Sequence, residues 1–215
     1  MSLIYKVRDK IQSVKNRLRQ SPHGGFRPTY PKHVDGGLKI HLGAGPINLQ
    51  GWVNIDARQA PHIHLQSEGF ALSEFADGAI SEIYMCHVLE HFSFEEIKAI
   101  VLNLCKKLRV GGVLRISVPD FDRLIAVYQA NGNDLELVKY ALMGGQDYAH
   151  NFHKAVFTHG SLAAILTECG FVSVESWETY AEFGVHIGDW SETGFSTPKG
   201  NFPISLNLKG VKSRA

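Results

Sequence analysis

The stretch KIHLGAGPINLQGWVNID, residues 39–56, constrains the fold more than any other part of the chain. A short apolar run ends in Gly43-Ala44-Gly45, and a second short run ends at Asp56, eleven residues after Gly45. Short apolar runs bounded by glycine are typical of buried strands. Open α/β sheets bind ligands at the carboxyl ends of their strands. The glycine loop and the acid are therefore expected to share one ligand-binding edge.

The rest of the chain alternates predicted strands with predicted helices. The strands are expected at 38–42, 52–57, 62–66, 81–87, 113–118, 171–178 and 204–212. The helices are expected at 94–108, 121–130, 134–143 and 160–170, the first capped by Ser93 and stopped by Gly111-Gly112. This alternation predicts an α/β fold with a mostly parallel sheet. The last two strands have no helix between them, which indicates one antiparallel member.

Residues 1–37 are expected to lie outside the α/β domain, which spans 38–215. Apolar residues recur at helical spacing over 3–19, and a linker rich in proline and glycine follows over 21–37. Residues 1–32 carry eight Lys or Arg against one acid, which leaves 14 basic and 20 acidic residues in the remainder. We expect this basic helix to pack on the domain or on a second copy in a homodimer. Contact of residues 1–20 with an anionic membrane or a partner is the alternative.

Cysteine usage and hydropathy indicate the compartment. The three cysteines have no paired spacing, which argues for a reducing environment. The sequence shows no signal peptide and no apolar run long enough to span a membrane. We therefore predict a cytoplasmic protein. A peripheral position at the inner face of the membrane belongs to the alternative in which the basic arm contacts lipid.

The glycine loop does not match a dinucleotide site. The G-x-G-x-x-G pattern would need a third glycine where Asn48 stands. The acid of that pattern lies about 20 residues after the glycines, whereas Asp56 lies eleven residues after Gly45. The intervening segment leaves room for little more than one helical turn, and a diphosphate needs a helix N-terminus. S-adenosylmethionine contains a ribose but no phosphate, so it suits the short loop better. A tight turn that binds no ligand is the remaining alternative.

Residues 87–91, HVLEH, match the H-x-x-E-H zinc signature of the inverzincin peptidases. That signature works on a helix, where residues four apart share a face. Here the five residues lie between a predicted strand and the helix that starts after Ser93. A peptidase is therefore not expected, and no metal is predicted.

Several segments together resemble the class I S-adenosylmethionine-dependent methyltransferases. They are LGAG with NID, FADGAISEIYMCHVLEHF and LCKKLRVGGVLRISVPD, in that order over residues 38–121. The later GGQ, NFH, LTECGF and ISLNLKGVK resemble bacterial members linked to cell-surface polysaccharide synthesis. The resemblance implies a Rossmann-like seven-stranded sheet, mostly parallel with the last strand antiparallel, and helices on both faces.

The resemblance also assigns residues to the cofactor, S-adenosylmethionine, and its product, S-adenosylhomocysteine. The positions are Gly43, Ala44, Gly45, Asp56, Gln66, Ser67, Cys86 and His87. The glycine loop would lie along the methionine moiety, Asp56 would bind the ribose, and Gln66 and Ser67 would lie near adenine. Cys86 and His87 would border the sulfonium and the methionine amine. His41 stands where many members have an acid, which removes one contact to the amine, and Ile47 replaces a common third glycine.

Histidines supply the candidates for taking a proton from an acceptor hydroxyl, because their pKa is closest to neutral pH. We favour His91 and His153, with His87 as the third catalytic candidate. Further candidates at the same edge are Glu90, Asp120, His150 and His159.

The predicted activity is methyl transfer, at oxygen, to a small-molecule or carbohydrate acceptor such as a cell-surface glycan precursor. The alternative is a non-catalytic binding or scaffold protein of such a pathway. A nucleic-acid substrate is not expected, because the body is acidic and lacks an N/D-P-P-Y/F signature. The long connection 181–202 is rich in glycine and aromatic residues, and Phe183, His186, Trp190 and Phe195 are candidates to cover a substrate.

Overall fold

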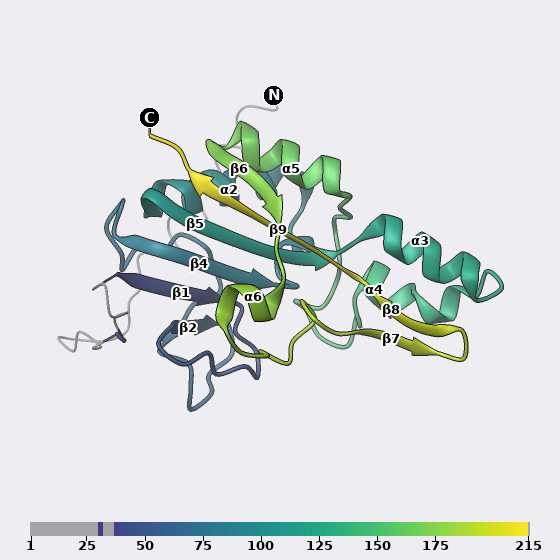
Figure 1. Ribbon diagram of the computed structural model, residues 1–215. Coiled ribbons are helices and arrows are strands. Elements are labelled where there is room, and N and C mark those ends of the chain that lie inside the picture. The colour runs from purple at the N-terminus through teal and green to yellow at the C-terminus, as the bar shows by residue number, and fades with distance from the viewer. Residues whose placement is uncertain (1–29, 32–36, 215) are drawn as a thin grey trace, which may run out of the picture.

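The chain folds around one seven-stranded sheet, with strand order β3-β2-β1-β4-β5-β9-β6 (Figure 1). The computed structural model describes residues 30–31 and 37–214. The strands are β1 (Leu38–Leu42), β2 (Val53–Asp56), β3 (Leu65–Gln66), β4 (Ile80–Cys86), β5 (Leu108–Pro119), β6 (Phe171–Ser176) and β9 (Ser205–Lys212). β1 to β5 pair in parallel, whereas β9 runs antiparallel between β5 and β6. The predicted fold, mostly parallel with an antiparallel last strand, is confirmed.

Two helices cover one face of the sheet, α2 (Phe94–Lys107) and α5 (His159–Glu168). Every second residue of the central strands, such as Ile40, Ile83 and Leu114, belongs to the same buried cluster as the apolar residues of these helices. This alternation follows from the two-residue period of a strand. Ser93 begins α2 in a capping box with Glu96, as the sequence predicts for its start.

The opposite face carries aromatic and charged side chains. Trp52, Tyr84 and Trp177 form a second buried cluster there, and Phe183 of the short helix α6 (Thr179–Phe183) packs against them. α6 lies across this face of the sheet (Figure 1). The loop that follows α6 crosses the carboxyl ends of the strands, so the packing of α6 positions one wall of the site described below.

An ion-pair network ties α6 to the sheet. The guanidinium of Arg115 donates to Glu182 Oε2 through Nε and Nη2, at 2.9 and 2.7 Å, and to Glu82 through Nη1. The Arg115 side chain is only 10% exposed. Lys209 pairs with the second oxygen of Glu182. This fork geometry is specific to arginine, because an ammonium has no planar pair of donors.

We expect Arg115→Lys to lower the free energy of unfolding by about 1–2 kcal/mol, because lysine keeps the charge but loses hydrogen bonds to partly buried carboxylates. Urea unfolding measures this change. Arg214→Lys, at an exposed position after β9, is the control and should stay within about 0.5 kcal/mol of the unsubstituted protein. Equal losses in the two variants would contradict a structural role for the fork.

Three predicted elements differ from the observed ones. The helix predicted at 94–108 ends at Lys107 and β5 begins directly, so Gly111 and Gly112 lie inside the strand and do not stop a helix. There the β4–β5 register shifts, Gly111 has φ +74°, and a Cβ on Gly112 would approach Arg109 O to 2.8 Å. The glycines therefore permit a bulge.

The helix predicted at 134–143 is divided into a 3-10 turn, Leu135–Leu137, and the short helix α4, Lys139–Met143. The third predicted strand is reduced to two residues.

The remaining helix and strands extend past the carboxyl end of β5. α3 (Phe121–Ala130) packs with the hairpin β7 (Gly194–Thr197) and β8 (Gly200–Pro203) in a third apolar cluster. The connection 181–202 is thus partly a hairpin. Among the described helices, none has the length and apolar character to cross a membrane. The basic helix predicted at 3–19 and most of the linker lie outside the described residues.

Candidate active site

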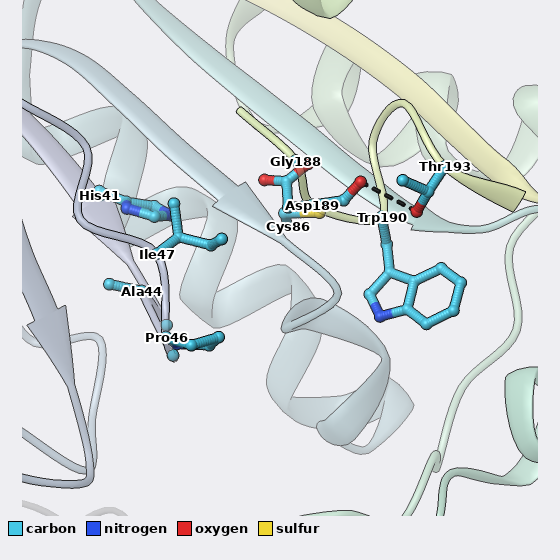
Figure 2. A pocket seen from close by; sticks show the side chains of 11 residues that line it. His41, Ala44, Pro46, Ile47, Cys86, Gly188, Asp189, Trp190 and Thr193 are labelled. Atoms are coloured by element: carbon cyan, nitrogen blue, oxygen red, sulfur yellow. Dashed lines mark hydrogen bonds between the residues drawn. The ribbon is translucent and has the colours of Figure 1, made fainter. Parts of the chain in front are cut away.

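A cavity of about 360 Å³ lies at the carboxyl ends of β1 and β4 (Figure 2). The glycine loop 43–47, His41 and Cys86 form one side. Residues of the loop after α6 form the other: Gly188, Asp189, Trp190 and Thr193. The volume lies in the range typical of small-molecule sites, roughly 300–1,000 Å³.

The glycine loop turns sharply beneath the cavity. Gly43 and Gly45 have φ values of +64° and +53°, which L side chains rarely adopt. A Cβ on Gly43 would lie 2.3 Å from Cγ2 of Val88, in the segment that follows β4. Two strand ends therefore approach each other more closely at Gly43 than a side chain would allow.

Asp56 holds this loop in place from the end of β2. Its Oδ2 accepts a hydrogen bond from the Gly45 N–H at 2.8 Å, and its Oδ1 accepts from the Arg58 N–H at 2.8 Å. The residue is only 8% exposed. A carboxylate has about four acceptor positions, so both oxygens can still accept a ligand hydroxyl.

Gln66 and Ser67 lie beside Asp56, and none of these three residues lines the cavity itself. Asp56 is linked to the cavity through its hydrogen bond with Gly45. The Ser67 N–H donates to Asp56 O at 2.9 Å, and Gln66 Nε2 donates to Ala57 O at 3.0 Å. Their predicted contact with adenine stays a prediction.

His41 is a neutral, buried wall of the cavity. Burial lowers its pKa to about 4, against the weaker opposing effect of its hydrogen bond to Asn54. The ring stacks on Tyr84 with centroids 5.2 Å apart. Asn54 donates through Nδ2 to Asn48 Oδ1 and His62 O, so its Oδ1 accepts from His41 Nδ1 at 3.1 Å. In that tautomer His41 Nε2 is left as an acceptor.

Asp189 is a site residue that the sequence reasoning missed. The Tyr84 hydroxyl donates to its Oδ2 at 2.6 Å, and the Ser191 N–H and hydroxyl donate to its Oδ1 at 2.9 and 2.6 Å. The loop of Asp189 lies across the cavity from His41 and the glycine loop (Figure 2). A carboxylate thus enters the cavity although position 41 lacks one. Its one sequence signal is an acid inside an aromatic, glycine-rich connection.

The three predicted catalytic histidines come together around Glu90. His87 Nδ1 lies 3.5 Å and His153 Nε2 lies 3.8 Å from Glu90 Oε1, and the rings of His91 and His153 have centroids 4.8 Å apart. Burial lowers the pKa of His87 to about 3 and of His153 to about 4, and it raises the pKa of Glu90 to about 8. His87 stacks on Trp190 with centroids 5.9 Å apart, which links this cluster to the cavity wall.

The other candidates lie apart from this cluster. His150 and His159 are exposed, and Asp120 caps α3 through the N–H of Asp122. Of the four aromatic and histidine candidates in the connection 181–202, Trp190 alone lines the cavity. Phe183 is packed against Tyr84 and Trp52, Phe195 packs against Trp190, and His186 pairs with Glu192 at the surface.

The solved structures that resemble this one include S-adenosylmethionine-dependent methyltransferases. One from Archaeoglobus fulgidus is 15% identical, with a TM-score of 0.51 over 98% of this chain and 100% of that chain. One from Methanosarcina mazei is 14% identical, with a TM-score of 0.52 over 87% and 96% of the two chains. The Burkholderia thailandensis 1,6-didemethyltoxoflavin-N1-methyltransferase, with bound 1,6-didemethyltoxoflavin and S-adenosylhomocysteine, is 16% identical, with a TM-score of 0.51 over 82% and 71%.

No protein-family model matches the sequence, and no curated protein matches it. At these identities the likeness concerns the arrangement of the backbone. The chain has the Rossmann-like fold of the S-adenosylmethionine-dependent methyltransferases.

Proposed function

We propose that this protein transfers a methyl group from S-adenosylmethionine to a small-molecule or carbohydrate acceptor, at oxygen. The observation that carries the proposal is the glycine loop, which Asp56 holds open beneath a cavity at the carboxyl ends of β1 and β4. The seven-stranded fold supports it.

The residues in the cavity, together with Asp56 beside it, fit the parts of the cofactor. Asp56 has acceptor capacity for ribose hydroxyls, and the turns at Gly43 and Gly45 let backbone approach the methionine moiety. Asp189 and the acceptor nitrogen of His41 suit its ammonium group, in place of the acid missing at position 41. When bound, S-adenosylmethionine supplies a methyl group on a positively charged sulfur.

We expect Asp189→Asn to weaken binding of S-adenosylhomocysteine about tenfold, the size of one lost charge-assisted contact. Binding of 5′-methylthioadenosine, which has the adenosine part but no amino acid part, should stay within about twofold. Calorimetric titration of one protein preparation with both ligands measures the difference. Equal weakening for both ligands would show that Asp189 acts on loop structure and does not contact the ammonium.

The chain contributes to methyl transfer mainly by positioning. Holding an acceptor in line with the methyl group is worth roughly 7–11 kcal/mol in well-oriented reactions. Trp190 offers an aromatic wall that suits a sugar ring or an apolar acceptor. His91, His153 and His87 remain the proposed groups around the acceptor hydroxyl, on the Trp190 side of the cavity.

The acceptor class comes from the sequence resemblance. A glycan precursor of the cell surface, a cytoplasmic location, homodimer formation and contact of residues 1–20 with a membrane or partner are parts of this proposal. The 1,6-didemethyltoxoflavin enzyme acts on a small molecule, which supports a small acceptor here.

Calorimetric titration of the full chain with S-adenosylhomocysteine tests the proposal. We expect saturable binding near one ligand per chain. No binding at millimolar ligand would refute the cofactor site. Incubation with S-adenosylmethionine and one sugar or lipid-linked acceptor at a time, with release of S-adenosylhomocysteine as the readout, would then identify the substrate.

A further inference from the structure

The cluster beside Trp190 has an unusual composition. Glu90, His91 and His153 each offer one ligand atom, and these atoms all lie within 4.8 Å of one another. His87 Nδ1 lies a further 3.5 Å from Glu90 Oε1. Both carboxylate oxygens of Glu90 are buried and have no hydrogen-bond partner among the described residues. Buried acceptors without partners are rare and cost free energy, so we expect a bound group to contact this carboxylate.

Backbone hydrogen bonds hold the cluster together. Glu90 and His91 lie in a 3-10 turn, Leu89–His91, which follows β4. The N–H groups of Lys154 and Ala155 donate to Glu90 O at 2.7 and 3.2 Å. Two segments far apart in sequence are thus joined at the residues that present these side chains, so the cluster is built by the fold.

The hydrogen bonds also define which ring nitrogens are acceptors. His153 Nδ1 donates to Ala141 O at 2.9 Å. Its Nε2 therefore carries a free lone pair, and this atom lies 3.8 Å from Glu90 Oε1. The Ser205 hydroxyl donates to Trp190 O at 2.6 Å, so Ser205 Oγ accepts from His87 Nε2 at 2.8 Å. That leaves His87 Nδ1 as a second lone pair facing Glu90.

The two ring nitrogens that face Glu90 are therefore both acceptors, and the only donor that these three groups can supply is a proton on Glu90 itself. A single proton can join the carboxylate to only one imidazole at a time. A metal ion can bind several of these lone pairs at once. His91 Nδ1 donates to Phe152 O, and His153 Nδ1 donates to Ala141 O. Metal-bound histidines usually donate their other ring N–H in this way.

We propose that Glu90, His91 and His153 bind a divalent transition-metal ion, with His87 as a fourth ligand or a supporting contact. Two histidines and one carboxylate form a common ligand set for Zn²⁺ and for Fe²⁺. Metal–ligand bonds of about 2.0–2.2 Å place two ligands roughly 3–4.4 Å apart, so only a small side-chain contraction is needed. The inference rests on these contacts and does not depend on the proposed methyl transfer.

The proposed metal site is linked to the cavity in which we propose that methyl transfer takes place. His87 joins the cluster to Trp190, which lines the cavity. A metal ion can lower the pKa of a bound hydroxyl, which removes the need for a histidine base.

The test uses the full chain after treatment with a chelator. Calorimetry with Zn²⁺ should show one high-affinity site per chain, and Co²⁺ should give the visible absorption of a nitrogen- and oxygen-ligated ion. Glu90→Gln and His153→Ala should each weaken binding of both ions by more than about 100-fold, since each removes a direct ligand. His159→Ala, an exposed histidine away from the cluster, should bind Zn²⁺ and Co²⁺ as the unsubstituted protein does.

Glu90→Gln also distinguishes the loss of a metal ligand from a loss of folding. The glutamine amide can donate to the lone pairs of His87 or His153, so the metal-free variant should unfold at the same temperature as the unsubstituted protein or higher. Addition of Zn²⁺ should raise the melting temperature of the unsubstituted protein and not that of Glu90→Gln. The proposal would be overturned if the unsubstituted protein bound no Zn²⁺, or if Glu90→Gln and His153→Ala bound Zn²⁺ as tightly as the unsubstituted protein does. Titration of the same samples with S-adenosylhomocysteine tests the cofactor site separately.

Discussion

Asp56→Ala should weaken binding of S-adenosylhomocysteine by at least about 100-fold, equivalent to roughly 3 kcal/mol or more. The carboxylate is expected to accept ribose hydroxyls, and a hydrogen bond to a charged group is worth about 1.5–3 kcal/mol. The same carboxylate accepts from the N–H groups of Gly45 and Arg58, so alanine also releases the glycine loop. Both losses act on the ligand in the same direction.

Calorimetry on the purified variant measures the effect, and circular dichroism shows whether the fold persists. Asp77→Ala is the matched control, because Asp77 is a half-exposed acid before the amino end of β4 that pairs with Lys106 and Lys107. The control should bind S-adenosylhomocysteine as the unsubstituted protein does. A folded Asp56→Ala protein that binds within about threefold of normal would place the ribose elsewhere.

The fold could be predicted from the sequence because its central elements have clear periodicity. The strand at 38–42 and the helix at 121–130 are observed with the predicted bounds. The bulge at Gly111-Gly112 was assigned wrongly as a helix stop, because glycine serves both purposes and only the pairing with β4 distinguishes them. The third strand is short because it is an edge strand paired only with the end of β2.

The part of the site that is local in sequence could also be predicted. The contact between Asp56 and Gly45 links neighbouring strand ends, and the strand–loop–strand pattern places them together. Asp189 could not be found in this way, because its position depends on a loop that returns across the sheet to meet Tyr84, 105 residues earlier. No metal is predicted from the sequence because HVLEH does not lie on a helix. The contact between His153 and Glu90 depends on how a distant loop docks, which that motif does not encode.

Gly43→Ala should lower the free energy of unfolding by about 2–5 kcal/mol. Two costs add: a left-handed backbone costs an L residue about 1–2 kcal/mol, and overpacking costs about 1–3 kcal/mol. The overpacking arises because the new Cβ would lie 2.3 Å from Cγ2 of Val88. Urea unfolding, with the midpoint and slope fitted separately, measures the loss.

Gly51→Ala separates the two costs. Gly51 lies in the same β1–β2 connection with φ +79°, but a Cβ there would meet nothing within 4 Å. It should therefore lose only the backbone cost, about 1–2 kcal/mol. Adding Val88→Ala to Gly43→Ala should recover about 1–3 kcal/mol relative to the sum of the single changes, because the clashing methyl groups are gone. Equal losses for Gly43→Ala and Gly51→Ala, with no recovery, would mean that the strand ends separate easily and that the glycine loop is not held rigidly beneath the cavity.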